Sequence, residues 1–216
     1  DSEHLKGMLV SMGYTLTEEI NEADFIIFNT CAVREHAQDR VYGNIGVVKN
    51  YKRKRENIIL AVCGCMAQQS HVAERIRKSY PYVDIVFCSK RDLTAFLGVT
   101  EESFFKTYSQ AKCLVTRERV IVSKDQHTVQ ATVYTDDGCV ATSEKTFAVK
   151  ERIGSGDAFT AGFLHGWLSS NGDIGAVLDF AITCFLLKHT IPGDVLPLSD
   201  AEISSYTIFS AKDVMR

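Results

Sequence analysis

Short apolar runs alternate along the chain with longer segments of helical periodicity. The runs at 25–28 and 58–63 are continuous, the run at 83–88 is apolar apart from Asp84, and all three are rich in Ile, Val, Leu or Phe, which is typical of strands buried on both faces of a parallel sheet. Helical spacing predicts helices at 2–13, 31–55 (with a break at Gly43 or Gly46), 67–80, 91–97 and 101–107. The alternation predicts an α/β fold with a doubly wound, mostly parallel sheet in a Rossmann-like three-layer arrangement.

The second half changes character after a predicted strand at 113–116. Segments 129–134 and 140–147 flank the turn residues TDDG and predict an antiparallel hairpin. Beyond the glycines at 154 and 156, the pattern predicts helices at 157–169, 173–188 and 199–205. Because no repeat or linker-like stretch separates the halves, we expect one continuous domain.

Composition narrows the function classes only slightly. The 216 residues carry a formal net charge of −3, so charge gives no global attraction to nucleic acid or membrane. No signal peptide and no apolar run of about 18 residues is found, and we expect a cytoplasmic protein with no membrane partner. The seven cysteines sit mostly in apolar contexts such as AVCGC and AITCF, which favours free buried thiols or metal ligands over disulfides.

Two cysteines directly follow predicted strands. Cys31 comes after FIIFNT and Cys65 after IILAVCG, and the carboxyl ends of parallel strands form the ligand-binding edge of open α/β sheets. Two soft ligands on neighbouring loops could hold an iron–sulfur cluster if a third joined them. The alternative is that both are simply small apolar residues of the sheet.

A glycine turn precedes the predicted helix at 157–169. Gly154, Ser155, Gly156 and Asp157 provide backbone amides at a helix amino terminus, where anionic charge on a phosphoryl group is stabilised. The carboxylate could accept a proton from an attacking hydroxyl. The alternative is an ordinary helix start, since Gly and Asp are common there.

The first part of the chain resembles the amino-terminal domain of tRNA methylthiotransferases. The resemblance covers residues 1–83 and is carried by GYTLTEEINEADFIIFNTCAVREHAQDRVYGNIG and CGCMAQQ. It implies that Cys31 and Cys65 are two of three ligands of a [4Fe–4S] cluster, with the third position falling before Asp1. The CxxxCxxC loop of that family's radical domain is not in the sequence, so methylthiolation is not expected. The basic stretch 49–55 could contact tRNA phosphates, or be the solvated face of a helix.

Residues 84–216 resemble the carboxyl-terminal half of ribokinase-like sugar kinases, most closely the 2-keto-3-deoxygluconate kinases. ERIGSGDAFTAGFLHGWL carries the resemblance, with FAITCFLLKHTIPGD downstream and VTRE upstream. It implies ATP and Mg²⁺ as ligands and Asp157 as general base, with an anion hole formed by Gly154, Ser155 and Gly156. It further implies nucleotide or metal contacts at Ser89, Asp92, Thr116, Arg117 and Thr183.

The sequence therefore predicts a chimera whose segments, 1–83 and 84–216, meet near 82–88. The sugar pocket of such kinases comes mainly from the half that is replaced here, so we expect nucleotide binding with little or no phosphoryl transfer and no firm sugar-acid substrate. Two alternatives stay open: an iron–sulfur module of the methylthiotransferase type, and an engineered fold chimera without activity. A sheet edge left by the replaced half could also lead to self-association.

Overall fold

The computed structural model describes residues 2–29, 35–55, 57–63, 82–95, 99–109, 111–170 and 172–212. For residues 2, 35–42, 91, 92, 95 and 207–212 it describes the backbone alone. The chain folds as two compact units. Unit 1 contains residues 1–16, 119–132 and 140–216, and unit 2 contains residues 17–118 and 133–139.

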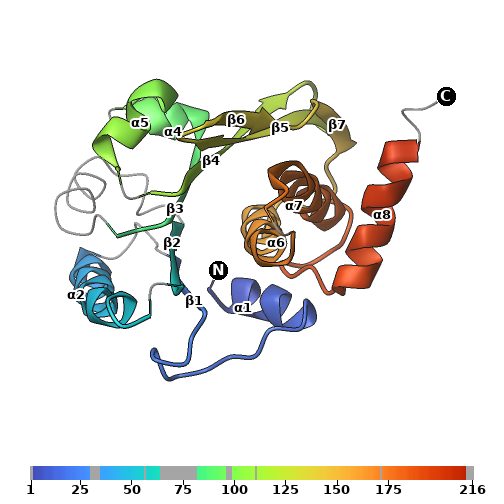
Figure 1. Cartoon of the computed structure of the whole chain (residues 1–216). Coiled ribbons are helices and arrows are strands. Elements are labelled where there is room, and N and C mark those ends of the chain that lie inside the picture. Colours follow the sequence, from blue (N-terminus) through green and yellow to red (C-terminus); the bar gives the residue numbers. More distant parts are fainter. Residues whose placement is uncertain are drawn as a thin grey trace. The chain divides into compact units, whose positions relative to one another are not determined.

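The strands of the described residues form a seven-stranded mixed sheet (Figure 1). Its order is β1-β2-β3-β4-β5-β6, and β7 also pairs with β5. The strands are β1 (Phe25–Asn29), β2 (Ile59–Cys63), β3 (Ile85–Ser89), β4 (Cys113–Ile121), β5 (Gln126–Thr135), β6 (Gly138–Ala141) and β7 (Lys145–Ala148). Pairing from β1 to β4 is parallel. The predicted α/β fold with a mostly parallel first half is confirmed.

Unit 2 buries its apolar strand residues against helices α2 (Glu35–Lys52), α4 (Lys90–Ala95) and α5 (Glu101–Thr107). Ile45 and Val48 of α2 pack with Leu60 and Val62 of β2. The predicted break in this helix is wrong, because α2 runs through Gly43 without interruption. Its buried apolar residues hold one continuous face against the sheet. The predicted helix at 67–80 lies outside the described residues.

Unit 1 is built on a close pair of helices, α6 (Ser155–Ser169) and α7 (Ile174–Lys188). A Cβ at Gly162 would lie 2.6 Å from Cys184 Sγ, and one at Gly166 would lie 3.1 Å from Val177 Cα. Both glycines therefore allow the two backbones to approach closely. α1 (Ser2–Ser11) packs against α6, and α8 (Asp200–Lys212) packs against α7. α8 continues well beyond the predicted end at residue 205.

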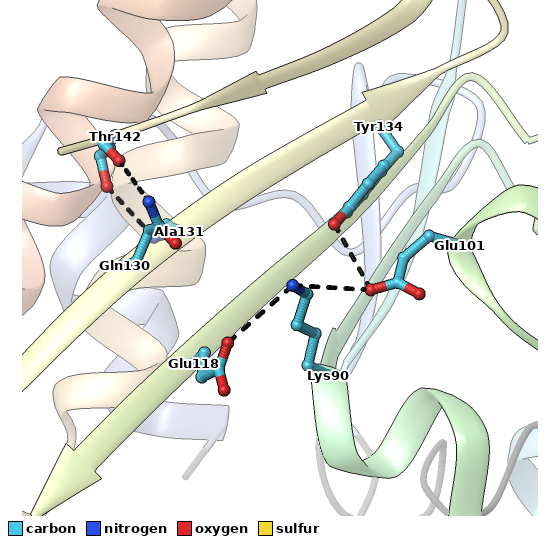
Figure 2. A network of polar contacts seen from close by, with 7 residues as sticks. All are labelled: Lys90, Glu101, Glu118, Gln130, Ala131, Tyr134 and Thr142. Atoms are coloured by element: carbon cyan, nitrogen blue, oxygen red, sulfur yellow. Dashed lines mark hydrogen bonds and ion pairs between the residues drawn. The ribbon is translucent and has the colours of Figure 1, made fainter. Parts of the chain in front are cut away.

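The strand predicted at 140–147 is interrupted. It forms β6 and β7 on either side of Thr142, and β7 is antiparallel to β5. The Thr142 hydroxyl accepts from the amide of Ala131 at 3.1 Å, while its carbonyl accepts from Gln130 Nε2 at 3.0 Å (Figure 2). The threonine side chain thus takes a place in the ladder that the backbone of an unbroken strand would fill.

None of the five cysteines in the described part of the chain forms a disulfide. Cys63, Cys113 and Cys184 are buried, as the apolar contexts predicted, whereas Cys139 is exposed. Burial raises the pKa of the Cys113 and Cys184 thiols far above the usual range, so both stay neutral at physiological pH. Across the residues described, we find no helix with the length and apolar character needed to span a membrane.

Candidate functional site

The predicted glycine turn, residues 154–157, forms the N-cap and the first turn of α6. Gly154 is the N-cap residue with φ of 78°, a left-handed conformation that is costly for any residue with a Cβ. A Cβ at this position would also overlap the backbone carbonyl of Asp194, lying 2.8 Å from its carbon atom. Conformation and space both require glycine here.

The first turn of α6 presents amides without helical partners. The Ala158 amide donates to the Gly154 carbonyl at 2.9 Å, which is the first α-helical hydrogen bond. The amides of Ser155 and Gly156 precede this bond and have no carbonyl four residues earlier within the helix. Because the glycine N-cap makes no side-chain cap, the positive end of the helix dipole can act on an external anion.

The two polar side chains of the turn differ in role. Ser155 is buried and its Oγ donates to the carbonyl of Arg152 at 3.0 Å, so this hydroxyl closes the turn. Asp157 is half-buried in the first turn of the helix. A carboxylate beside these amides can accept the proton of a hydroxyl that attacks a phosphoryl group.

Hydrogen bonds fix the backbone that enters the turn. The amides of Lys150 and Glu151 donate to the carbonyl of His189 at 3.2 and 3.1 Å. In turn, Glu151 Oε1 accepts from the amides of Arg152 and Ile153 at 2.8 and 3.2 Å. The bonds from Ile153 and Arg152 lower the pKa of the Glu151 carboxyl, which keeps this acceptor ionised. The approach to the glycine turn is therefore well ordered.

A buried lysine lies at the end of α7. Lys188 has no exposed surface, and its Nζ donates to the carbonyls of Ile191 at 3.0 Å and Gly193 at 2.6 Å. Burial lowers its pKa, while the charges of Glu151 and Asp194 raise it. This ammonium thus binds the loop whose next residue touches the glycine turn.

The amino-terminal helix α1 contacts the same loop. His4 Nε2 lies 2.7 Å from the carboxylate oxygen Oδ2 of Asp194. One turn later, a Cβ at Gly7 would lie 3.7 Å from Val195 Cγ1. A helix from the methylthiotransferase-like segment therefore supports a loop of the kinase-like segment, within unit 1.

Two arginines of unit 1 interact electrostatically, and one of them lies close to the turn in the sequence. Burial and then the charge of Arg152 lower the pKa of Arg119. Burial, followed by the charges of Arg119 and Arg152, also lowers the pKa of His127. The two guanidinium groups thus act on one another, and Arg152 precedes Gly154 by two residues. The sequence reasoning singled out neither arginine.

The other predicted nucleotide residue of unit 1, Thr183, lies in α7. It is half-buried, and its Oγ1 donates to the carbonyl of Asp179 at 2.7 Å. This is the usual bond of a threonine to its own helix. The structure places Thr183 on the helix that packs against α6, and its proposed contact with adenine stays a prediction.

A second group of predicted residues lies where β3 and β4 run side by side in unit 2. Ser89 is in register with Arg117, and Cys88 with Thr116. Thr116 is buried, whereas Ser89 and Arg117 are half-buried. The backbone of Asp92 lies in α4, just after β3, and the structure describes only the backbone of this residue. The sheet thus brings Ser89, Thr116 and Arg117 together.

Lys90 joins this second group, although the sequence reasoning passed over it. Its Nζ lies 3.8 Å from Glu101 Oε1 and 3.9 Å from Glu118 Oε2 (Figure 2). The hydroxyl of Tyr134 donates to the same oxygen of Glu101 at 3.4 Å. The ammonium therefore sits between carboxylates from α5 and β4, at the start of α4.

The predicted kinase-like residues consequently fall into two groups, one in each unit. Residues 154–157 and 183 belong to unit 1, and residues 89, 92, 116 and 117 belong to unit 2. Within unit 2, Ser89, Thr116 and Arg117 lie on adjacent strands, whereas in unit 1 the turn residues and Thr183 lie on the paired helices α6 and α7.

The predicted metal ligands Cys31 and Cys65 lie outside the described residues. The strands that precede them are described, and Asn29 of β1 is in register with Cys63 of β2. Each predicted ligand follows one of these paired residues by two positions. The described strands β1 and β2 therefore end at the same edge of a parallel pair.

Comparison with known sequences separates the first part of the chain from the rest. Residues 1–88 match the model of an uncharacterized protein family, UPF0004. Ninety residues are 58% identical to a tRNA-2-methylthio-N(6)-dimethylallyladenosine synthase of Caldicellulosiruptor saccharolyticus, covering 42% of this chain and 19% of that protein. The same enzyme of Clostridium tetani is 59% identical over 87 residues, which cover 40% of this chain and 19% of the relative. The chain thus spans only 19% of either relative.

Comparison with solved structures gives a different family of folds. A PfkB family carbohydrate kinase from Listeria grayi aligns with a TM-score of 0.70 at 22% identity, covering 92% of this chain and 65% of the kinase. A 2-dehydro-3-deoxygluconokinase from Thermotoga maritima gives a TM-score of 0.72 at 18% identity, covering 87% and 61%. A fructokinase with bound ATP from Xylella fastidiosa gives 0.61 at 15% identity, covering 89% and 63%.

The two comparisons overlap along the chain. A fold match that covers 92% of the residues must include much of segment 1–88, whose sequence matches the other family. The predicted double resemblance is confirmed. The chain combines an amino-terminal segment similar in sequence to tRNA methylthiotransferases with the fold of carbohydrate kinases, consistent with a chimera.

Proposed function

We propose that unit 1 binds the phosphate groups of Mg²⁺–ATP at the glycine turn and that the chain transfers the phosphoryl group slowly or not at all. The observation that carries the proposal is the N-cap at Gly154. Its positive φ and its contact with Asp194 fix a helix start whose N-cap residue makes no side-chain cap, so the first-turn amides of Ser155 and Gly156 point toward an external anion. Such a helix start is suited to an anion.

The residues present fit a phosphate chain. Backbone amides, a helix amino terminus and the guanidinium groups of Arg119 and Arg152 all favour negative charge. Bound ATP would supply the transferable phosphoryl group, with Mg²⁺ neutralising phosphate charge. Asp157 would hold the proton of an acceptor hydroxyl. The similarity in fold to carbohydrate kinases supports this choice, since the fructokinase of Xylella fastidiosa was solved with bound ATP.

The proposal stops at nucleotide binding. Within the described part of the chain, no group of residues is assigned to a sugar. The substrate hydroxyl that Asp157 would deprotonate therefore has no assigned binding site, and the expected phosphorylation rate with 2-keto-3-deoxygluconate is near zero.

Melting with and without Mg²⁺–ATP tests the proposal. A ligand that binds the folded state alone, at about a hundred times its dissociation constant, stabilises it by roughly 2.7 kcal/mol. We expect this gain for the parent chain and for Asp157→Asn, because the asparagine removes the base and keeps the amides. Replacing both Gly154 and Gly156 with alanine should remove the gain.

The same proteins separate binding from catalysis. An unchanged melting temperature of the parent at saturating Mg²⁺–ATP would reject the proposal. Fast phosphorylation of the sugar acid that is lost in Asp157→Asn would show that an acceptor site exists, contrary to the expected slow transfer.

A second candidate function rests on the paired strands β1 and β2. The two strands end at the same edge, Cys31 and Cys65 each follow a strand end by two positions in the sequence, and segment 1–88 is similar in sequence to tRNA-2-methylthio-N(6)-dimethylallyladenosine synthases. Thiolates are the ligands of iron–sulfur clusters. We propose that this edge holds a labile cluster through the two cysteines.

Anaerobic reconstitution with ferrous iron and sulfide tests this second candidate. We expect a brown protein whose visible absorption is lost in Cys31→Ser and in Cys65→Ser. Cys139→Ser is the matched control, because Cys139 is exposed and lies on β6. Equal visible absorption in the parent and all three variants would indicate nonspecific iron sulfide. No visible absorption here, together with no change in melting temperature with Mg²⁺–ATP, would favour a scaffold without activity.

A further inference from the structure

Lys188 is a buried charge that the proposed nucleotide site does not use. It is the last residue of α7, it has no exposed surface, and a charged group in such a place is costly unless its hydrogen bonds are made. Its two identified acceptors are backbone carbonyls, those of Ile191 and Gly193. The ammonium is therefore an internal cation for a loop and not an ordinary surface lysine.

That loop leads directly to the glycine turn. Gly193 has φ of 86°, a left-handed backbone conformation, and the carbonyl of the next residue, Asp194, lies against Gly154. The neighbouring His189 carbonyl accepts the amides of Lys150 and Glu151, four and three residues before Gly154. The contacts of the glycine turn with this loop depend on where these carbonyls point.

Electrostatics agrees with such a role. The charges of Glu151 and Asp194 stabilise the ammonium, and both residues flank the turn. Without the ammonium, two carbonyl oxygens and two nearby carboxylates would lose their shared cation. Repulsion and lost hydrogen bonds would then loosen the loop.

We propose that Lys188 is a positioning residue for the anion site: its ammonium holds the carbonyls of Ile191 and Gly193 so that Asp194 supports Gly154 and the first-turn amides of α6 keep their direction. The effect on ATP binding rests on the proposed function. The positioning of the turn by Lys188 rests only on hydrogen bonds and contacts seen in the protein without ligand.

Hydrogen exchange and ATP affinity of Lys188→Met test the inference. Methionine keeps the length of the side chain and removes the charge and the donors. Amides of residues 150–157 should exchange about tenfold faster than in the parent, and ATP should bind about tenfold more weakly, the effect of one charged hydrogen bond. Lys124→Met is the control, because Lys124 is exposed in unit 1 and should leave both readouts unchanged.

Lys188→Ala adds a readout that a merely structural lysine would not give. The truncation leaves room beside the carbonyls, and added ammonium chloride should restore slow exchange and ATP affinity, whereas tetramethylammonium chloride at equal ionic strength should not. Normal exchange in Lys188→Met, or fast exchange that ammonium does not reverse in folded Lys188→Ala, would overturn the inference. If the parent fails to bind ATP, the nucleotide proposal fails, and the exchange data alone still decide whether Lys188 orders the turn.

Discussion

Replacing Gly154 with alanine is expected to destabilise unit 1 by about 2–4 kcal/mol and to abolish the stabilisation by Mg²⁺–ATP. The left-handed φ of 78° accounts for part of this cost, and the overlap of the new Cβ with the Asp194 carbonyl accounts for the rest. The turn cannot shift away from the Asp194 loop to relieve this overlap without moving that loop, because backbone hydrogen bonds from Lys150 and Glu151 to His189 connect the two segments. Urea unfolding followed by the fluorescence of Trp167 measures the effect, since this is the single tryptophan and it lies in α6.

Gly172→Ala separates the two causes. Gly172 also has a positive φ, of 94°, but a Cβ there would meet nothing within 4 Å. We expect a loss of about 1 kcal/mol from backbone strain alone, with the ATP effect intact. If Gly154→Ala cost no more than Gly172→Ala, the contact with Asp194 would not hold the turn as described.

The strands and helices that local patterns can specify were predictable. The apolar run at Phe25–Phe28 is β1 of a parallel pair, and the apolar helices at 157–169 and 173–188 are α6 and α7 within two residues at each end. The misplaced elements depend on distant partners. The interruption at Thr142 exists because its hydroxyl meets the amide of Ala131, which no local pattern reveals.

The candidate site was predictable only where one short segment carries it. The glycine turn could be recognised because Gly154 to Asp157 are consecutive. Lys188 could not, because a lysine at the end of an apolar helix ordinarily lies in solvent at the negative end of the helix dipole. Its burial results from the loop that folds back over it, and that loop contacts Gly154 from 40 residues away in the sequence (194 − 154 = 40).

A buried carboxylate also escaped the sequence reasoning, although it lies where the two resemblances meet. Asp84 is 4% exposed in unit 2, just before β3. Its carboxylate pairs with the ammonium of Lys52 and lies 3.4 Å from that of Lys112, and it accepts from the amide of Leu60 at 2.9 Å. The side chain thus joins α2, β2 and the segment before β4. In the sequence, a single aspartate at the start of the apolar run VDIVF does not show that its carboxylate is buried.

Asp84→Ala is therefore expected to destabilise unit 2 by about 3–5 kcal/mol, the usual cost of removing one partner from a buried ion pair. The ammonium of Lys52, whose side chain is 13% exposed, would lose its carboxylate, and the Leu60 amide would lose its acceptor. Hydrogen exchange of β2 and β3 should accelerate in proportion. Asp84→Asn should cost less, since its amide oxygen can still accept from Leu60.

Asp24→Ala is the matched control for the charge itself. Asp24 pairs with Arg55 at 2.9 Å, but its side chain is 73% exposed, so water replaces the lost partner. We expect a change of at most about 1 kcal/mol. Because both aspartates lie in unit 2 and each pairs with a basic residue near the end of α2 or just beyond it, the difference between the two variants measures burial and not charge. Equal losses would mean that the Asp84 pairing is as well solvated as a surface ion pair, and that the sheet does not depend on it.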